Sequence, residues 1–342
     1  MKDLIEAINA NPKWTDSTKK SRIAILNFIK KDLKNDKNGF DFLKDHKLIE
    51  KYIKDNNKNP NTAQSKLLTI KNCLALVDQK ASLKYDKLAT DLQDAITEYR
   101  DNNTTIPEKL LTMKEMVEIP YRLENTIKYI YGDVFLTKDQ LKELKTQKNI
   151  NKYMRYLTDY VISVFYLWQP PIRSELSILQ FQKSDNLNWY DPKNNTVYYN
   201  DFKNVKSFGK RSFVLDKRIS DVLNNYIKVL KVVVKDPKRL IYIWQTKDNI
   251  QFSRSSFCSY FRNLMKKLTG NVLTLNNFRH SYETSIISNP KYNNLTIGQK
   301  RAIHERLLHR WQTAQEYMQV PTKSTKPSID LEEIVGDETK EK

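Results

Sequence analysis

The chain has 342 residues and a formal net charge of +19, from 59 lysines and arginines against 40 aspartates and glutamates. This length favours two domains, each large enough to bury its own core. The positive excess is typical of proteins that bind polyanions, above all nucleic acids. A coding bias toward Lys, Asn, Ile and Tyr would also raise the lysine count, but it does not explain the imbalance between basic and acidic residues.

Cysteine content and hydropathy exclude two classes of protein. Cys73 and Cys258 are the only cysteines, and each lies in its own apolar pattern, which excludes a disulfide framework and a cysteine-based zinc site. The longest apolar run, around Tyr160 to Trp168, is too short to cross a bilayer, and the first residues lack an apolar signal region. We therefore expect a soluble, intracellular protein with reduced cysteines and no membrane segment.

Residues 1–103 are expected to form a domain that contains only helices. Apolar residues at helical spacing predict four of them. The first helix begins with a cap at Asp16-Ser17-Thr18 and extends to Leu33, and the second extends from Phe40 to Ile53. The third begins with a cap at Thr62 and extends to Val77, and the fourth extends from Tyr85 to Tyr99. Lysines fill the opposite faces of these helices, and we expect either plain solvated surface or contacts with phosphates there.

The stretch from Arg100 to Pro107 is polar, ends in proline and lacks periodicity, which predicts a linker, assigned to residues 104–111. A second domain is expected over 112–320. Its first part should contain a short helix capped by Thr112, an irregular tyrosine-rich stretch, and a strong helix from Lys152 to Trp168. Two prolines break that helix, and they fit the first turn of a new helix with Arg173 at its N-terminal end.

The second part of this domain should contain the only strands. Residues 187–215 alternate apolar and polar side chains between turn formers, and 204–215 is expected to be a hairpin with a basic tip. Further elements are predicted in the order of the chain: helices at about 217–234 and 254–268, a short strand at 240–243 between them, a helix opening near 273–282, and a helix from about 297 to 308. Residues 321–342 read as a flexible tail. The fold class is mostly α with a small antiparallel β-sheet (α+β).

A basic and aromatic set of residues is spread over the second domain. It comprises Arg173 after Pro-Pro-Ile, Lys206 in the hairpin, Arg279 in Asn-Asn-Phe-Arg-His-Ser, His309 in Leu-Leu-His, and Tyr317 eight residues later. A tyrosine phenol titrates near 10 and is a poor nucleophile at neutral pH. It becomes useful where cationic groups stabilise the phenolate or the charge that develops on its target.

This order of motifs resembles the tyrosine recombinases, the phage-integrase-type site-specific recombinases. The resemblance covers roughly 155–320, and the helical first part looks like the family's core-binding domain, which contacts DNA. Each motif alone is weak evidence, whereas five in the right order are strong. The Pro-Pro-x-Arg opening and the Thr-Ala-Gln between His309 and Tyr317 look most like the branch found in large DNA viruses and their satellites.

The resemblance implies a role for each residue. Arg173 and Arg279 would bind the non-bridging oxygens of the scissile phosphate. Lys206 would protonate the departing 5′ oxygen, and His309 would donate a hydrogen bond to the same phosphate. Tyr317 would attack it to give a 3′-phosphotyrosyl link. Such proteins act on double-stranded DNA as tetramers on two sites, with no ATP, metal or other cofactor, in whichever compartment holds the DNA (nucleus, viral factory or cytoplasm).

Some positions depart from the family pattern or leave a choice open. Asn276 stands where the family usually has histidine or lysine, and an amide cannot accept a proton as a base. Glu175 follows Arg173 by two residues where the family's acidic partner follows by three, and the glycine usually found before the last histidine is replaced by Leu308. Lysines 203 and 210 compete with Lys206 for the role of general acid.

Two other functions compete with site-specific recombination. A type IB topoisomerase uses the same set of side chains and also lacks the first histidine, but the Ser-Lys-x-x-Tyr sequence typical of that class is absent around Tyr317. A DNA-binding relative with weakened catalysis is the second alternative, and only Asn276 favours it. The recognition sequence, and the choice between integration, excision and resolution, cannot be read from these residues.

Overall fold

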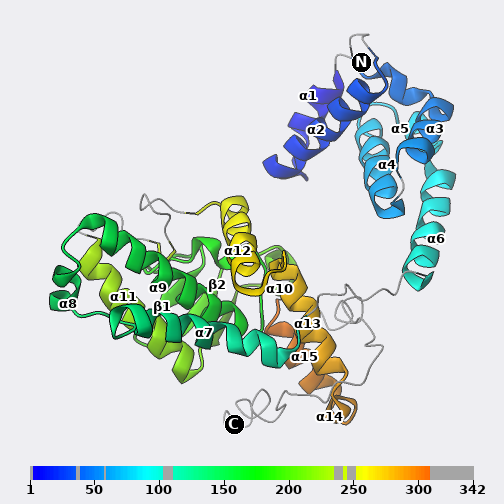
Figure 1. Ribbon diagram of the computed structural model, residues 1–342. Coiled ribbons are helices and arrows are strands. Elements are labelled where there is room, and N and C mark those ends of the chain that lie inside the picture. Colours follow the sequence, from blue (N-terminus) through cyan, green and yellow to red (C-terminus); the bar gives the residue numbers. More distant parts are fainter. Residues whose placement is uncertain are drawn as a thin grey trace. The chain divides into compact units, whose positions relative to one another are not determined.

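The computed structural model describes residues 3–35, 39–57, 59–102, 111–234, 242–244 and 252–308 (Figure 1). The described chain is mostly helical and contains one three-stranded antiparallel sheet, which confirms the predicted fold class. It divides into two compact units, Met1–Thr104 and Thr105–Lys342. Most of the predicted linker and the whole of the predicted tail lie outside the described residues.

The first unit consists of helices packed around α4. Its elements are α1 (Asp3–Ala10), α2 (Asp16–Asp32), the 3-10 helix η1 (Asp41–Lys44), α3 (His46–Asn56), α4 (Pro60–Leu74), α5 (Gln79–Leu83) and α6 (Asp86–Asn102). Helix α4 contacts α1, α2, α3, α5 and α6. Its buried residues, among them Leu67 and Ile70, join one core with Leu26 and Ile29 of α2 and Ile49 of α3.

The capping residues of this unit differ from those predicted. Thr15 caps α2 by accepting a hydrogen bond from the backbone N of Thr18, and Asn59 caps α4 by accepting one from Asn61. The segment predicted as one helix over 40–53 is divided, because the Asp45 carboxylate accepts a hydrogen bond from Leu48 N and starts α3 there. At α2 and α4 a residue ahead of the predicted cap supplies the oxygen that satisfies the first backbone donors.

The second unit begins with a helix that the sequence did not predict at full length. Helix α7 (Met113–Tyr131) starts with a capping box in which Thr112 and Glu115 each bond the other's backbone N. It then passes through Pro120, where an irregular tyrosine-rich stretch was expected. A proline inside a helix removes one backbone hydrogen bond. Pro120 lies among the buried residues of α7, and packing of that face offsets the loss.

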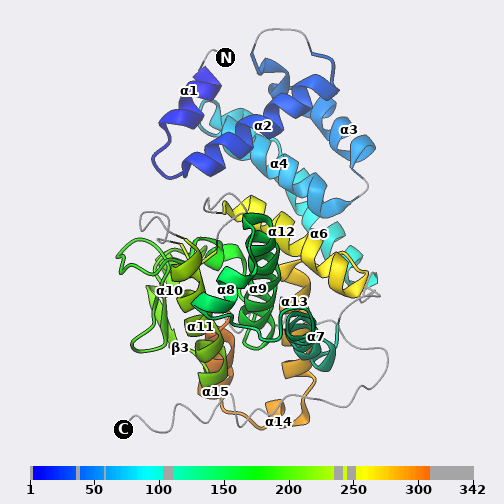
Figure 2. The same ribbon diagram turned by 60° about the vertical axis from the view of Figure 1, so that its left-hand side comes forward.

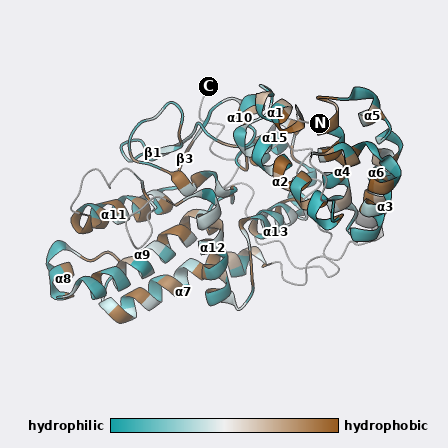
Figure 3. Ribbon diagram, turned by 90° about the horizontal axis from the view of Figure 1, so that it is seen from above, coloured by the Kyte–Doolittle hydropathy of each residue, from teal (hydrophilic) through white to brown (hydrophobic). Residues whose placement is uncertain are grey.

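Helix α9 is the centre of the second unit. It follows α8 (Lys138–Glu143) and spans Gln147–Leu167, and it packs against α7 and against α11 (Lys217–Val233). Residues 157–167 of α9 are buried without a break. Figure 3 shows hydrophobic and hydrophilic residues alternating along α7, α9 and α11, as expected of helices with one buried face.

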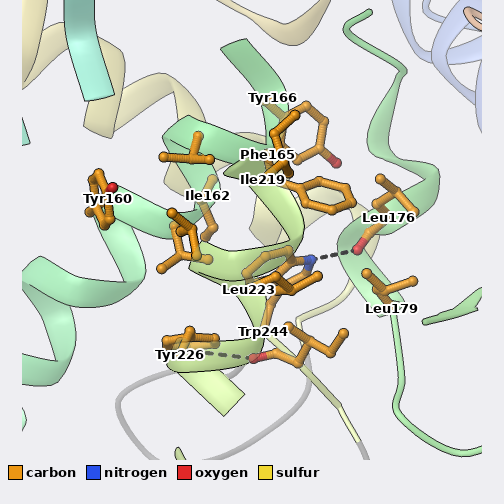
Figure 4. Packing of buried hydrophobic residues seen from close by; sticks show 14 of the residues in the cluster. Tyr160, Ile162, Phe165, Tyr166, Leu176, Leu179, Ile219, Leu223, Tyr226 and Trp244 are labelled. Carbon is orange, nitrogen blue, oxygen red and sulfur yellow. Dashed lines mark hydrogen bonds between the residues drawn. The ribbon is translucent and has the colours of Figure 1, made fainter. Parts of the chain in front are cut away.

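A buried tryptophan joins α9, α11 and the segment after α9. Trp244 is fully buried, and its Nε1 donates a hydrogen bond to the carbonyl of Leu176, 2.8 Å away (Figure 4). Tyr226 of α11 donates to the carbonyl of Ile243 over 3.3 Å. Only 242–244 of the region around the predicted strand 240–243 are described, and there Tyr242 forms an isolated bridge with Gln180.

The sheet and the last helices complete the second unit. Strands β1 (Trp189–Asp191), β2 (Thr196–Tyr199) and β3 (Arg211–Val214) form an antiparallel sheet in the order β1-β2-β3. Helix α12 (Arg254–Thr269) lies against the 3-10 helix η2 (Ser174–Ile178) and α13 (Leu275–Ile287). Helices α13, α14 (Pro290–Asn293) and α15 (Ile297–Glu305) form a group with a small core of its own (Figure 2).

Candidate active site

Four of the six predicted site residues lie among the described residues, all in the second unit. They are Arg173, Lys206, Asn276 and Arg279. His309 and Tyr317 lie outside the described residues, which end at Leu308 in this part of the chain. The site can therefore be followed from both arginines and the lysine up to the residue directly before His309.

Arg279 is a buried charge on a rigidly capped helix. Thr274 and Asn277 form a capping box at the start of α13, which fixes the turn just before Arg279. The Arg279 side chain is only 1% exposed, and its Nη1 donates a hydrogen bond to the carbonyl of Pro171 over 3.0 Å. A guanidinium stays charged in proteins, so its burial must be offset by hydrogen bonds or by an anion. The bond to the Pro171 carbonyl supplies one such hydrogen bond.

Arg173 lies on the segment that Arg279 contacts. It is half-buried and stands at the N-cap position of η2 in an extended conformation. The predicted helix with prolines in its first turn is wrong: a 3-10 helix begins after Arg173, and both prolines precede it. Residues before a proline disfavour the helical region, so two successive prolines keep the preceding chain extended. The carbonyl of Arg173 accepts a hydrogen bond from Tyr166 of α9 over 3.3 Å.

Glu175 follows Arg173 and is turned into the protein. Its side chain is buried, and its backbone carbonyl accepts a hydrogen bond from Asn188 Nδ2 over 2.8 Å. The same amide nitrogen also donates to the carbonyl of Asp201. Together with the Tyr166 and Arg279 bonds, these contacts hold the chain on both sides of Arg173 at fixed positions.

Lys206 lies in the connection between β2 and β3. The two strands pair antiparallel, with Tyr199 opposite Arg211, so the hairpin predicted within 204–215 is wrong: its first strand is β2, at 196–199. Lys206 does not lie at a simple hairpin tip, however, but in the single helical turn α10 (Val205–Phe208). Its side chain is exposed, whereas Val205 and Phe208 pack against the large core of the unit. A sequence pattern that alternates over 204–215 could not separate this turn from a strand.

The competing lysines of this connection differ in their surroundings. Lys210 Nζ donates a hydrogen bond to the carbonyl of Asp185 over 2.6 Å. Lys203 is exposed, as Lys206 is. The ammonium group of Lys210 is thus engaged with the loop before β1.

Asn276 has a histidine one helical turn along. Its Nδ2 lies 3.2 Å from Nε2 of His280, and the side chain of Asn276 is exposed. Residues four apart on a helix are neighbours on its surface. An imidazole therefore stands beside the position where a histidine was expected and an asparagine is found. The spacing of four between Asn276 and His280 could have indicated this contact from the sequence.

The chain that enters His309 is held by a residue with unusual backbone geometry. Helix α15 ends at Glu305, three residues earlier than predicted, and Leu308 has a φ of +57°. This is the left-handed region that favours glycine. Leu308 thus takes the backbone conformation that a glycine before the histidine would supply without strain.

Leu307 and Leu308 pack into different cores. Leu307 joins the small core with Tyr282, Ile286 and Tyr292, and Leu308 joins the large core of the unit. The carbonyl of Leu308 also accepts a hydrogen bond from Asn204 Nδ2 over 3.4 Å. This contact joins the end of the described chain to the turn that carries Lys206.

A buried hydrogen-bonded triad joins α13, α14 and α15. His304 is fully buried, with Nδ1 3.1 Å from Glu283 Oε1 and Nε2 2.7 Å from the hydroxyl of Tyr292. Burial, together with the nearby charge of Glu283, raises the pKa of Tyr292 to about 12. The burial of His304 with a polar partner on each ring nitrogen was not visible in the sequence.

These contacts form one connected set. Arg279 and Asn276 share α13, and Arg279 binds the segment of Arg173. The triad holds α13 to α15. Leu308, three residues after the end of α15, accepts a hydrogen bond from Asn204 at the start of the turn that carries Lys206. A buried guanidinium, a second arginine and an exposed lysine are groups that can bind and protonate a phosphodiester.

Among the described residues, no group of three or more histidine, cysteine, aspartate or glutamate side chains could hold a metal ion. No helix in the described part of the chain is both long and apolar enough to cross a membrane.

Comparisons with known proteins gave one kind of match. No family model matches the chain, and no curated protein matches it. Among solved structures, it is similar to one titled "Crystal structure of XerA recombinase", with 15% sequence identity and a TM-score of 0.39, over 94% of this chain and 93% of that chain.

Proposed function

We propose that this chain is a tyrosine recombinase, an enzyme that cuts and rejoins DNA strands through a covalent tyrosine link. The observation that carries the proposal is the buried Arg279, whose guanidinium reaches the segment of Arg173 from a helix more than a hundred residues further along the chain. Two arginines whose segments are joined in this way are suited to bind the two non-bridging oxygens of one phosphate.

The remaining roles follow from the order of the motifs. Tyr317 Oη attacks the scissile phosphorus, and the bond between phosphorus and the 5′ oxygen breaks. Lys206 gives its proton to that oxygen, which leaves as a 5′ hydroxyl. The bond of Lys210 to the Asp185 carbonyl supports Lys206 as the donor. His309 donates a hydrogen bond to the same phosphate.

The second half of the reaction reverses the first. A 5′ hydroxyl from a partner strand attacks the 3′-phosphotyrosyl link and releases Tyr317. The phosphodiester bond energy is conserved, so the reaction requires neither ATP nor a metal. Exchange between two duplexes needs four active tyrosines, which implies a tetramer on two double-stranded DNA sites. The net charge of +19 supports binding to the phosphate backbone.

Trapping of the covalent intermediate tests the proposal. The full chain is incubated with DNA from the locus that encodes it, nicked so that the cleaved end diffuses away. We expect an adduct that resists denaturation and is abolished by Tyr317→Phe, and mapping of its junctions would give the site. An adduct that survives Tyr317→Phe would reject this nucleophile. Relaxation of a supercoiled plasmid without recombinant joints would favour a topoisomerase instead.

A further inference from the structure

We propose that Asn204 is a positioning residue that ties the general-acid turn to the chain entering His309. The inference rests on the proposed function, since it assigns Lys206 as the group that Asn204 positions. Its basis is the hydrogen bond from Asn204 Nδ2 to the carbonyl of Leu308, between residues 104 positions apart in the chain. Asn204 lies two residues before Lys206, and Leu308 directly precedes His309.

The side chain of Asn204 does not serve its own helix. Asn204 is the N-cap residue of α10, a place where asparagine usually accepts a hydrogen bond from the first backbone donors. Here it makes no such side-chain bond. Its backbone carbonyl instead accepts bonds from Ser207 N over 2.9 Å and from Phe208 N over 3.0 Å. The backbone of Asn204 thus shapes the turn, and its side chain is left to place the turn relative to Leu308.

The acceptor of this bond, the Leu308 carbonyl, is held in place by packing on both sides. Leu308 is only 4% exposed and packs in the large core, while Leu307 packs in the small one. Leu308 N also donates to the Glu305 carbonyl over 2.8 Å. A residue held by its neighbours on two sides keeps its carbonyl in one place, so that a hydrogen bond to it can locate another segment.

The turn that carries Lys206 needs a hydrogen bond of this kind to fix its position. Helix α10 is one turn of four residues in the connection between β2 and β3, and Gly209 follows it with a φ of +69°. Val205 and Phe208 anchor one side of the turn in the core, and Lys206 is exposed on it. The Asn204 bond adds a second direction of restraint. It couples the position of the proton donor to the position of the chain that enters His309.

The test uses Asn204→Asp in the full chain. Aspartate has the same shape, and the backbone carbonyl at position 204 can still accept the bonds from Ser207 N and Phe208 N, but a carboxylate cannot donate to the Leu308 carbonyl. Asn194→Ala is the matched control, because Asn194 donates to Asp191 in the β1–β2 turn of the same sheet. Lys206→Ala serves as the reference for complete loss of the general acid.

The first measurement compares cleavage of two nicked substrates. One has an ordinary scissile phosphate, and the other has sulfur in place of the bridging 5′ oxygen. A thiol titrates near 8.5, so the departing thiolate needs no proton from Lys206. We expect Asn204→Asp to cleave the ordinary substrate about ten- to a hundredfold more slowly than the wild type, and the sulfur substrate at the wild-type rate. Lys206→Ala should show the same rescue, and Asn194→Ala no loss.

The second measurement needs no activity. Hydrogen exchange of the backbone amides in 303–308 should be about fivefold faster in Asn204→Asp than in the wild type, and unchanged in Asn194→Ala. Unchanged exchange at 303–308 in Asn204→Asp would overturn the inference, as would an equal loss of cleavage on both substrates. If the wild type forms no adduct with either substrate, the proposed function fails, and the exchange experiment still decides whether Asn204 holds the two segments together.

Discussion

Arg279 Nη1 donates a hydrogen bond to the carbonyl oxygen of Pro171 over 3.0 Å, two residues before Arg173. The two arginines proposed to bind the phosphate are therefore linked through the backbone, and one of them has a structural task as well. Arg279 is 1% exposed and Arg173 is half-buried, so substitutions at the two positions should differ in their effect on stability.

We expect Arg279→Ala to lower the free energy of unfolding by about 1–3 kcal/mol, because the Pro171 carbonyl loses a buried donor. Arg173→Ala should lower it by less than about 1 kcal/mol. Both variants should lose covalent adduct formation while their DNA affinity changes little. Urea unfolding and adduct yield measure the two effects, with the exposed Arg301→Ala as a control. If DNA affinity fell in step with cleavage, the arginines would be positioning residues for DNA.

Asn276 is the position where a proton acceptor is missing. Replacement by histidine supplies an imidazole on the exposed first turn of α13. We expect Asn276→His to speed cleavage at least about tenfold, since general-base catalysis contributes about 10²–10⁴-fold. The rate should acquire a dependence on pH near 6.5, the ordinary titration range of histidine. Asn276→Gln is the control, and an unchanged rate in Asn276→His would contradict a limiting role for the missing base.

Leu308 has a φ of +57° and a buried side chain, so its two properties can be separated by substitution. Glycine and alanine both remove the packing, at about 2–5 kcal/mol. In the left-handed region alanine carries a further strain of about 1–2 kcal/mol, which glycine avoids. We therefore expect Leu308→Gly to be more stable than Leu308→Ala in urea unfolding.

The neighbouring leucine provides the reverse comparison. Leu307 is also buried, but it is not among the residues with positive φ. At this position glycine relieves no strain, and its greater conformational freedom in the unfolded chain lowers the free energy of unfolding by about 0.5–1 kcal/mol relative to alanine. Leu307→Gly should thus be less stable than Leu307→Ala. The same order of stability at both positions would argue against strain at Leu308.

The sequence predicted those parts of the fold that depend on local patterns. The long helices α9, α11 and α12 were found from apolar spacing, and alternation with turn residues indicated strands over 187–215 without giving the pairing of β2 with β3. Helix α7 was predicted only as a short helix capped by Thr112, with an irregular stretch after it. A proline inside a helix costs one backbone hydrogen bond, and burial of Pro120 beside Ile119 and Leu123 outweighs that cost, which no local pattern shows.

The candidate site could be predicted only as a set of positions. The motifs indicated Arg173, Lys206 and Arg279, but not that Arg279 would be buried on the Pro171 carbonyl. The partners of Asn204 and His304 lie far from them in the chain, and no spacing rule connects a loop asparagine with Leu308. The positive φ of Leu308 was also hidden, because leucine rarely adopts that conformation. The assignments of His309 and Tyr317 stay predictions.

Asp159 is a buried carboxyl in the middle of α9, and burial raises its pKa. It accepts a hydrogen bond from the hydroxyl of Tyr260. Because the folded pKa lies above the unfolded one, the contribution of this group to stability is fully present at low pH. It is lost as the pH rises through the folded pKa. Asp159→Asn keeps an acceptor for Tyr260 and removes the buried charge, so the variant should gain stability relative to the wild type from pH 4 to pH 8.

Asp139 is the control with the opposite sign. It is exposed, and the hydrogen bond from Lys142 lowers its pKa. Its contribution to stability is therefore present above the ordinary range of a carboxyl and is lost as the pH falls. Asp139→Asn should change stability only slightly, because surface ion pairs contribute little, and any loss should be greatest at high pH. Urea midpoints of the wild type and both variants, measured at intervals between pH 4 and pH 8, test the two signs together. Parallel curves for Asp159→Asn and the wild type would show that Asp159 carries no buried charge that opposes folding.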